Sequence, residues 1–241
     1  MRQATKRPTV STVSSPRASD HLAPAGARRQ AGIRRGIPFG IAVFAIAISF
    51  GVLARPTMGA IAPIVMSIVV FSGAAQFGSL AILTAGGSAG AAIAAAVLLN
   101  ARYLAMGLAL APSLRGSARS RAGIAMTTVD ASWAAASVGD GTFDPWYMLG
   151  VSVPQYAGWV LGTVLGVVIG PALGDPRALG LDALFPAFFV ALLFEEARGR
   201  RRLAAAGGGA GIALGLTPLV PPGLPILAAT AAAFVASRIR S

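Results

Sequence analysis

Two apolar stretches of the chain contain polar side chains that could do chemistry. Asn100 and Arg102 stand within the apolar segment 88–111, and Asp130 stands within the segment 122–138. A charged side chain at the centre of a bilayer costs about 2.5–3.5 kcal/mol on insertion scales, so it usually has a partner or a purpose. Asn100 or Arg102 could bind a carboxylate, and Asp130 could carry a proton or bind an ammonium group. The alternative is structural, with Arg102 satisfying carbonyl groups or pairing with Asp130.

Tyr103 and Asp182 are further candidates for these two roles, substrate binding and proton coupling. Tyr103 follows Asn100 by three residues, so their side chains can share a helix face, which Arg102 cannot share with Asn100. Tyr103 therefore joins the candidates for substrate binding. Asp182 stands near the start of the segment 180–196, where a carboxylate can cap free amides and favours the helix dipole. It is the second candidate for proton coupling, with capping as its structural interpretation.

The run Phe71-Ser-Gly-Ala-Ala-Gln-Phe77 places small polar groups between two aromatic side chains. Ser72 and Gln76 are four residues apart and share a helix face, and Gly73 weakens a helix by about 1 kcal/mol relative to Ala. Uncharged hydrogen-bonding groups among apolar side chains suit a zwitterion that carries a hydrocarbon side chain. We therefore predict that Ser72, Gly73 and Gln76 bind substrate; the structural alternative is hydrogen bonding between helices.

Missing residue types exclude several kinds of chemistry. The chain has no cysteine, its single histidine is His21, and it lacks a phosphate-binding loop for a nucleotide. No pairing of a nucleophile with a base is visible in the sequence. We therefore expect no metal, no cofactor and no enzymatic activity. The energy for any transport would come from an ion gradient, a partner or the substrate gradient itself.

The composition indicates that membrane helices position these residues. Of the 241 residues, 55% are hydrophobic and only 12% are charged, whereas soluble domains carry about 25% charged residues. A membrane helix needs about 20 apolar residues. The sequence predicts an all-α, polytopic bundle of seven or eight transmembrane helices, some of them interrupted. The apolar segments are 37–54, 58–84, 88–111, 122–138, 146–172, 180–196, 203–218 and 224–237.

The segments 58–84 and 146–172 are longer than one crossing requires. A tilted helix is one interpretation, and a broken helix that frees backbone groups for a substrate is the other. The residues that could interrupt them are Pro63 with Gly73 in the first, and Pro154 with Gly158 in the second.

The charged residues predict the domain organisation and the orientation. Residues 1–35 form a basic tail that we expect to be disordered and cytoplasmic, and residues 36–241 form the transmembrane permease domain. The net charge of +12 gathers beside apolar segments, which favours contact with a bilayer and argues against nucleic-acid binding. With eight spans, however, one basic cluster falls outside. Two interpretations stay open: one long segment crosses an even number of times, or 122–138 does not span fully. That cluster is Arg115, Arg119 and Arg121.

Glycines recur every four residues in two apolar segments. This spacing gives a helix a smooth face along which a second backbone can approach closely. We predict that both faces pack against other helices, either of this chain or of a partner. The two sets are Gly162, Gly166 and Gly170, and Gly207, Gly211 and Gly215.

Taken in order, the motif 71–77, the run Asn100-Ala-Arg102-Tyr103, then Asp130, and then Gly180-Leu-Asp182 with Pro186 resemble the AzlC family. The resemblance extends over about residues 32–237. It implies the large permease subunit of a bacterial exporter of branched-chain amino acids, sited in the cytoplasmic (inner) membrane. It also implies export of leucine, isoleucine, valine and sometimes methionine, driven by the proton-motive force, with a small AzlD-type membrane partner.

Other functions remain open on the sequence alone. The chain could be a structural subunit whose glycine faces dock an active partner, or an exporter of another small amphiphilic substrate. A channel-like pore is a further alternative.

Overall fold

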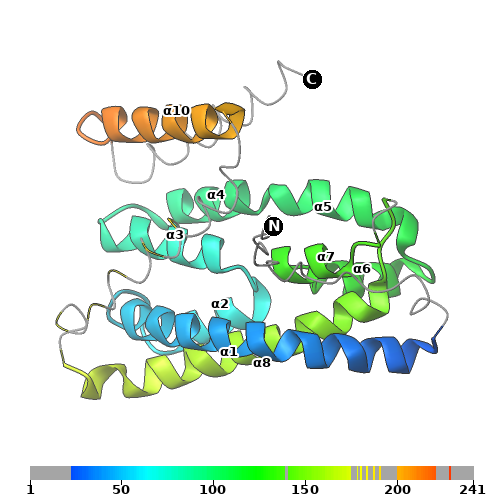
Figure 1. Cartoon of the computed structure of the whole chain (residues 1–241). Coiled ribbons are helices and arrows are strands. Elements are labelled where there is room, and N and C mark those ends of the chain that lie inside the picture. The colour runs from blue at the N-terminus through cyan, green and yellow to red at the C-terminus, as the bar shows by residue number, and fades with distance from the viewer. Residues whose placement is uncertain are drawn as a thin grey trace, which may run out of the picture. The chain divides into compact units, whose positions relative to one another are not determined.

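The computed structural model describes residues 23–138, 141–174 and 200–220, and also residues 178, 180, 183, 187, 190 and 228. Its regular elements are helices (Figure 1), and the described part of the chain contains no strand beyond one bridge between Ser137 and Phe143. The prediction of an all-α fold is therefore confirmed for these residues. In chain order the elements are α1 (Ala25–Met58), α2 (Ile61–Val69), α3 (Gly73–Thr84), α4 (Ala89–Asn100), α5 (Arg102–Leu110), η2 (Ala111–Ser113), α6 (Ala118–Met126), α7 (Asp130–Ala136), α8 (Pro145–Ile169), η3 (Gly170–Ala172) and α10 (Arg200–Leu216).

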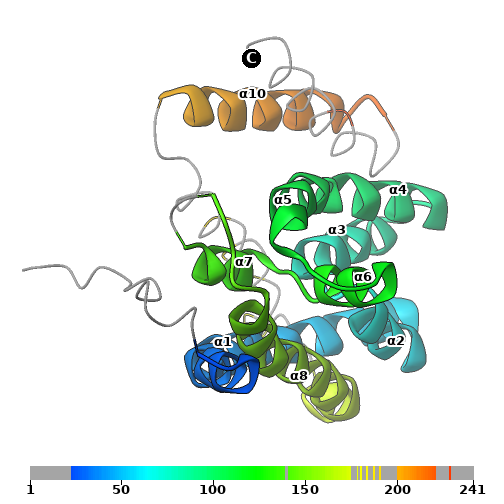
Figure 2. The same ribbon diagram turned by 90° about the vertical axis from the view of Figure 1, so that its right-hand side faces the viewer.

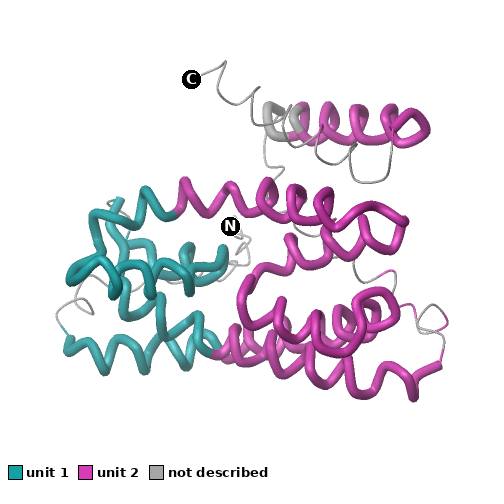
Figure 3. Tube along the Cα trace, turned by 180° about the vertical axis from the view of Figure 1, so that it is seen from behind, with its two compact units in different colours: residues 1–36, 107–153 teal, residues 37–106, 154–241 magenta. Residues whose placement is uncertain are grey.

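The chain divides into two compact units, which Figure 3 shows in different colours. Unit 1 takes the residues up to Gly36 and the range Gly107–Val153. Unit 2 takes Ile37–Met106 and the residues from Pro154 onward. Helices α1, α5 and α8 each contribute residues to both units.

Three stretches of helix are long and apolar enough to cross a membrane. They are Ala25–Met58, Ala89–Ser113 and Pro145–Ala172, with 34, 25 and 28 residues. The shorter apolar helices Gly73–Thr84 and Ala206–Leu216 do not reach a full crossing. The predicted segments 180–196 and 224–237 lie outside the described residues except at single positions. A bundle of seven or eight transmembrane helices therefore stays a prediction.

Helix α1 begins at Ala25, before the expected boundary between residues 35 and 36. Its first turns are rich in Ala, Arg and Gln, which are good helix formers. They also pack within unit 1, because a Cβ placed on Gly32 would clash with the carbonyl of Tyr147 in α8. The part of the predicted tail from Ala25 onward is therefore helical.

The predicted segment 58–84 is broken, but the break lies at residues 70–72. Pro63 stands in the first turn of α2, where a proline is tolerated. Phe71 has φ 40°, a left-handed conformation that a bulky residue seldom adopts, and helix α3 starts two residues later. The helical ladder ends here because Phe71 turns the backbone out of the right-handed region.

The broken-helix interpretation is wrong for the segment 146–172. Helix α8 runs without interruption through Pro154 to Ile169. A proline removes one backbone hydrogen bond from a helix, and here the surrounding packing keeps the helix intact. On α1, a Cβ at Gly40 would lie 2.7 Å from the Pro154 carbonyl oxygen, so the two backbones touch at this point.

Two other predicted segments are divided in ways that the sequence did not indicate. The segment 88–111 forms α4 and α5, which meet at Ala101. The segment 122–138 falls within α6 and α7, of nine and seven residues. At 1.5 Å per residue, neither α6 nor α7 is long enough to cross a bilayer.

Close backbone contact between α1 and α8 organises unit 2. In Figure 2 the two helices are seen nearly end-on and lie side by side. A Cβ on Gly162 or Gly166 of α8 would clash with the α1 carbonyl oxygens of Phe44 and Ile48, and one on Gly51 would clash with Thr163. The glycines of both helices thus allow an approach that no larger residue would permit.

An aromatic cluster fills the space beside this helix pair. The rings of Phe50 and Phe77 meet edge to face at 5.3 Å, and Phe50 stacks on Trp159 at 6.5 Å. All three side chains are buried, together with Ala47. Phe77 comes from α3, so the cluster fixes the second half of the broken helix against α1 and α8.

We predict that Gly166→Ala lowers the thermal stability of the detergent-solubilised protein. The new methyl group would meet the Ile48 backbone, which cannot rotate away, and overpacking of this kind costs about 1–3 kcal/mol. Gly211→Ala is the matched control, because a Cβ at Gly211 meets no atom of the described residues within 4 Å and Ala favours a helix. Thermal unfolding followed by size-exclusion chromatography measures both. Equal melting temperatures for the two variants would contradict close α1–α8 packing.

Candidate functional site

The break between α2 and α3 exposes backbone and polar groups inside unit 2. Ser72 is the N-cap of α3, and its Oγ accepts a hydrogen bond from the amide of Ala75 at 3.4 Å. The same hydroxyl donates to Oδ1 of Asn100 at 2.7 Å. Asn100 is the last residue of α4. The structure therefore brings together Ser72 and Asn100, two predicted site residues that are far apart in the sequence.

Gln76 lies at the centre of a buried chain of hydrogen bonds. Its Nε2 donates to Oγ of Ser67 at 2.8 Å, and its Oε1 accepts a hydrogen bond from the Trp159 indole. Ser67 also shares a hydrogen bond of 2.8 Å with Thr163, whose hydroxyl donates to the Trp159 carbonyl. The side chain of Gln76 is fully buried. Because its amide oxygen and nitrogen both have partners, Gln76 stabilises the broken helix.

Gly73 is required for this arrangement. A Cβ at this position would lie 2.9 Å from the Trp159 ring, which already donates to Gln76. A larger residue would displace the indole from its hydrogen bond. Gly73 thus serves the packing around the break.

Tyr156 of α8 contacts the residues beside the break. The hydroxyl of Tyr156 donates to the carbonyl oxygen of Ile68 at 2.9 Å, which satisfies a group that the end of α2 leaves free. The Tyr156 ring meets Phe71 edge to face at 5.1 Å. A left-handed non-glycine residue costs about 1–3 kcal/mol and persists only where its surroundings hold it. Tyr156 supplies such support to Phe71.

An apolar cavity of about 630 Å³ lies next to Asn100. Its walls come from α1, α2, α3, α4 and α5, and among the described residues that line it only Ser79 and Asn100 have polar side chains. Ser79 donates to the carbonyl of Ala92 at 3.1 Å. Asn100 uses its Oδ1 for Ser72 and, among the residues that the structure describes, makes no other side-chain hydrogen bond. Its amide NH₂ group is the polar group that the cavity offers to a ligand.

Arg102 and Tyr103 lie apart from this hydrogen-bonded chain. Nη2 of Arg102 is 3.5 Å from the Tyr103 hydroxyl, and the guanidinium lies 5.1 Å from the centre of the Tyr103 ring. Arg102 is exposed and Tyr103 is partly buried. Neither residue lines the cavity. Their assignment to substrate binding stays a prediction.

The structure leaves the two candidates for proton coupling untested. Asp130 is the first residue of α7, in unit 1, and its side chain is exposed. Because Arg102 belongs to unit 2, their proposed ion pair stays untested. Asp182 lies outside the described residues. Within the described chain, no three His, Cys, Asp or Glu side chains gather as metal ligands would.

The glycine sets have different surroundings. Gly162 and Gly166 face α1, and a Cβ on Gly170 would lie 3.4 Å from Cα of Val52. Around Gly207, Gly211 and Gly215, in α10, a Cβ would meet no described atom within 4 Å. The structure thus gives a packing partner within the chain to the first set of glycines.

Four residues of the site are absent from the sequence prediction: Ser67, Tyr156, Trp159 and Thr163. Each is a single polar or amphipathic side chain in an apolar segment, which alone does not distinguish a site from ordinary helix packing. Ser67 and Thr163 offered a weak signal, because both hydroxyls can join helices in a membrane. Their pairing depends on the close approach of α8 to the rest of unit 2.

Comparison with known proteins gives one match. A family model described as AzlC protein matches residues 38–173, more than half of the chain. The matched range contains the helix break, Asn100, Arg102 and Asp130. No curated protein and no solved structure matches.

We predict that Trp159→Phe destabilises the protein while Trp133→Phe does not. The first substitution keeps the aromatic packing but leaves the buried Gln76 Oε1 without its donor, which costs about 1–3 kcal/mol. Trp133 is the matched control, because its buried Nε1 already lacks a partner among the described residues. Thermal unfolding in detergent compares the two. A loss of stability in Trp133→Phe that equals the loss in Trp159→Phe would overturn this account of the network.

Proposed function

The chain belongs to the AzlC family, a family of membrane transport proteins, and we propose that it exports branched-chain amino acids. The substrates are leucine, isoleucine and valine, with methionine as a further one. The exporter acts in the bacterial cytoplasmic membrane with a small AzlD-type membrane subunit, and the proton-motive force drives it. The match over residues 38–173 supports this proposal, because it covers the motif 71–77, the run Asn100–Tyr103 and Asp130, on which part of the resemblance depends.

One structural observation carries the choice of substrate: a polar amide stands at the wall of an apolar cavity beside a broken helix. The cavity volume of about 630 Å³ falls within the range of small-molecule sites. Its apolar walls suit a branched hydrocarbon side chain, and Asn100 can donate to a carboxylate. This combination favours an amphiphilic zwitterion over a purely charged or purely polar substrate.

The ends of the broken helix suit the two charges of an amino acid. The N-terminus of α3 carries free amides and a positive dipole end, which favour a carboxylate. The C-terminus of α2 carries free carbonyl groups and a negative dipole end, which favour an ammonium group. Transporters use interrupted helices in this way near the middle of the membrane. We therefore assign Ser72 and Asn100 to the recognition of the zwitterionic end.

We predict that Ala96→Leu abolishes leucine export by filling the apolar cavity, which Ala96 lines. Cells that express the chain with its small partner would be fed a leucine-containing dipeptide, and leucine release would be followed over time. Release should fall at least about tenfold, because hydrophobic pockets discriminate single methylene groups by 10–200-fold. Asn100→Leu should abolish release through loss of its amide.

Ala105→Leu is the matched control, because Ala105 is exposed and does not line the cavity. It should keep the wild-type rate. Equal rates in Ala96→Leu and Ala105→Leu, with both proteins in the membrane, would exclude this cavity as the substrate site. Absence of leucine, isoleucine, valine and methionine release from the wild type would exclude the proposed export and favour a structural subunit.

Asp130 is our candidate for proton coupling, and Asp182 is the second. A carboxyl group can change its protonation as its surroundings change, which couples a proton gradient to movement. In the same assay, an uncoupler should abolish wild-type release. Asp130→Asn should remove the release that depends on the gradient while the protein stays inserted. Full gradient-driven release in Asp130→Asn would sink the assignment.

We propose that the start of α1 and the loop before α6 both face the cytoplasm. Arg28 and Arg115 line one pocket within unit 1, so both basic stretches belong to the same side. Basic residues next to membrane spans favour the cytoplasmic side. The segment 59–88 then enters the membrane from the opposite side and returns to that side without crossing the bilayer.

Single cysteines test this orientation, because the natural chain has none. Gly26→Cys and Gly123→Cys add a side chain where a Cβ meets no atom within 4 Å in the part of the chain that the structure describes. We expect an impermeant maleimide to label both only after the cells are opened. Ala85→Cys, an exposed position between α3 and α4, should be labelled in intact cells. Opposite labelling of Gly26→Cys and Gly123→Cys would refute the proposed topology.

A further inference from the structure

Unit 1 contains a second cavity, of about 620 Å³, that the proposed transport does not use. The start of α1, the loop after η2, helix α6 and the start of α8 converge on it. The side chains around it are of two kinds, polar or charged and apolar. The first kind comprises Arg28, Ser113, Arg115, Ser120, Thr142 and Asp144, and the second includes Ile124, Phe143 and Trp146.

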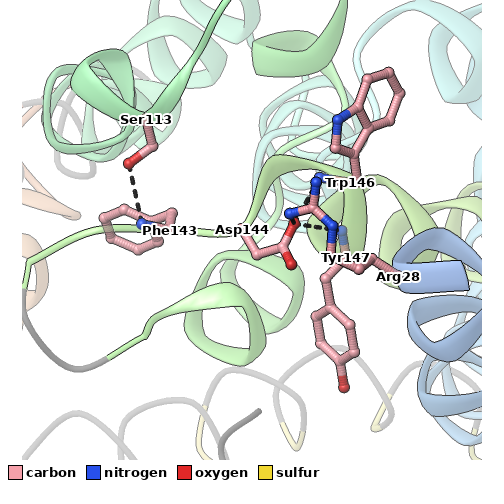
Figure 4. A network of polar contacts seen from close by, with 6 residues as sticks. All are labelled: Arg28, Ser113, Phe143, Asp144, Trp146 and Tyr147. Atoms are coloured by element: carbon pink, nitrogen blue, oxygen red, sulfur yellow. Dashed lines mark hydrogen bonds and ion pairs between the residues drawn. The ribbon is translucent and has the colours of Figure 1, made fainter. Parts of the chain in front are cut away.

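The wall of this cavity contains a partly buried ion pair, shown in Figure 4. Nη1 of Arg28 donates to Oδ1 of Asp144 at 3.0 Å, and Asp144 also accepts from the amides of Trp146 and Tyr147 at 3.1 Å. Asp144 thereby caps α8. Ser113 accepts from the Phe143 amide at 3.0 Å. These contacts fix the loop before α8 against α1 and η2.

Arg28 retains an unused donor in this wall. Its Nε is buried and has no hydrogen-bond partner within the described part of the chain. A guanidinium presents its donors in a planar fork that matches a phosphate or a carboxylate. Because Asp144 occupies one side of the fork, the cavity would suit an anion that binds Arg28 and Arg115 together.

The surroundings carry an excess of positive charge. The described residues of unit 1 include seven arginines and two aspartates, and one of these aspartates, Asp144, is paired with Arg28. Arg115, Arg119 and Arg121 are all exposed. Such a field attracts anions and repels cations.

The cavity also lies in the unit that contains one end of each candidate membrane span. Each candidate span has one end in unit 1, since α1 and α8 begin there and η2 ends there. Trp146, at the start of α8, is 39% exposed, and tryptophan is enriched at membrane interfaces. At a membrane interface the abundant anions are phospholipid phosphates.

We propose that this cavity binds the phosphate group of an anionic phospholipid. Arg28 and Arg115 hold the phosphate, hydroxyl groups such as Ser120 donate to its oxygens, and Trp146 contacts the glycerol and upper acyl chain. Basic pockets between membrane helices bind such lipids by this chemistry. The bound lipid would connect α1, α6 and α8 across the unit.

Native mass spectrometry of the purified full-length protein tests the proposal. The protein would be offered phosphatidylglycerol and phosphatidylcholine in equal amounts, and the retained lipid would be counted. We expect preferential retention of phosphatidylglycerol, which Arg115→Gln reduces about fivefold or more, as the loss of one basic contact predicts. Inorganic phosphate at millimolar concentration should not displace the lipid, because it lacks the apolar contacts.

Arg121→Gln is the matched control. It removes the same charge from the same part of unit 1, but Arg121 does not line the cavity, so retention should stay within about twofold. Equal losses in Arg115→Gln and Arg121→Gln would overturn the site in favour of diffuse surface attraction. Equal retention of the two lipids, or displacement by inorganic phosphate alone, would also overturn it. Size-exclusion chromatography of each variant verifies that the folded protein is being compared.

Discussion

The close contact between the backbones of α1 and α8 in unit 2 is the constraint on which the candidate site depends. Within a bilayer, helices gain little from the hydrophobic effect and associate through packing and hydrogen bonds. Glycines at Gly51, Gly162 and Gly166 allow that packing. It brings Trp159 and Thr163 to the position where they can bond Gln76 and Ser67. Without this contact, Gln76 and Ser67 would lose their hydrogen-bond partners on α8.

The break between α2 and α3 has an unfavourable backbone conformation that the surrounding residues must maintain. Phe71 in a left-handed conformation is unfavourable alone, and the helix ends on either side of it leave backbone groups unbonded. Tyr156 satisfies one carbonyl, Ser72 satisfies one amide, and Gln76 joins the break to α8. The groups that remain are those that a substrate could use. Because the network consists of uncharged groups, it can accept both ends of a zwitterion without burying a net charge.

The sequence predicted the residue types of the site better than their arrangement. An all-α fold, a break in 58–84 and the choice of Ser72, Gln76 and Asn100 as candidates follow from local signals: apolar runs, a glycine, and polar groups in apolar surroundings. The continuity of α8 through Pro154 does not follow, because it depends on packing against α1. The division at Ala101 also lacks a signal, since no proline or glycine stands there. The bond between Ser72 and Asn100 is a tertiary contact that no spacing along one helix can reveal.

The distribution of the arginines agrees with the tendency of basic residues to face the cytoplasm once the short helices are not counted as membrane spans. Counting 58–84 as a span puts Arg115, Arg119 and Arg121 on the side opposite the N-terminal arginines, against the tendency of basic residues to stay inside. Helices α2, α3, α6 and α7 are each too short to span. Within unit 1, Arg28 and Arg115 line one cavity. Asp144 stands among these basic residues, where it neutralises Arg28 and caps α8. The positive charge of both segments can then act at one membrane surface.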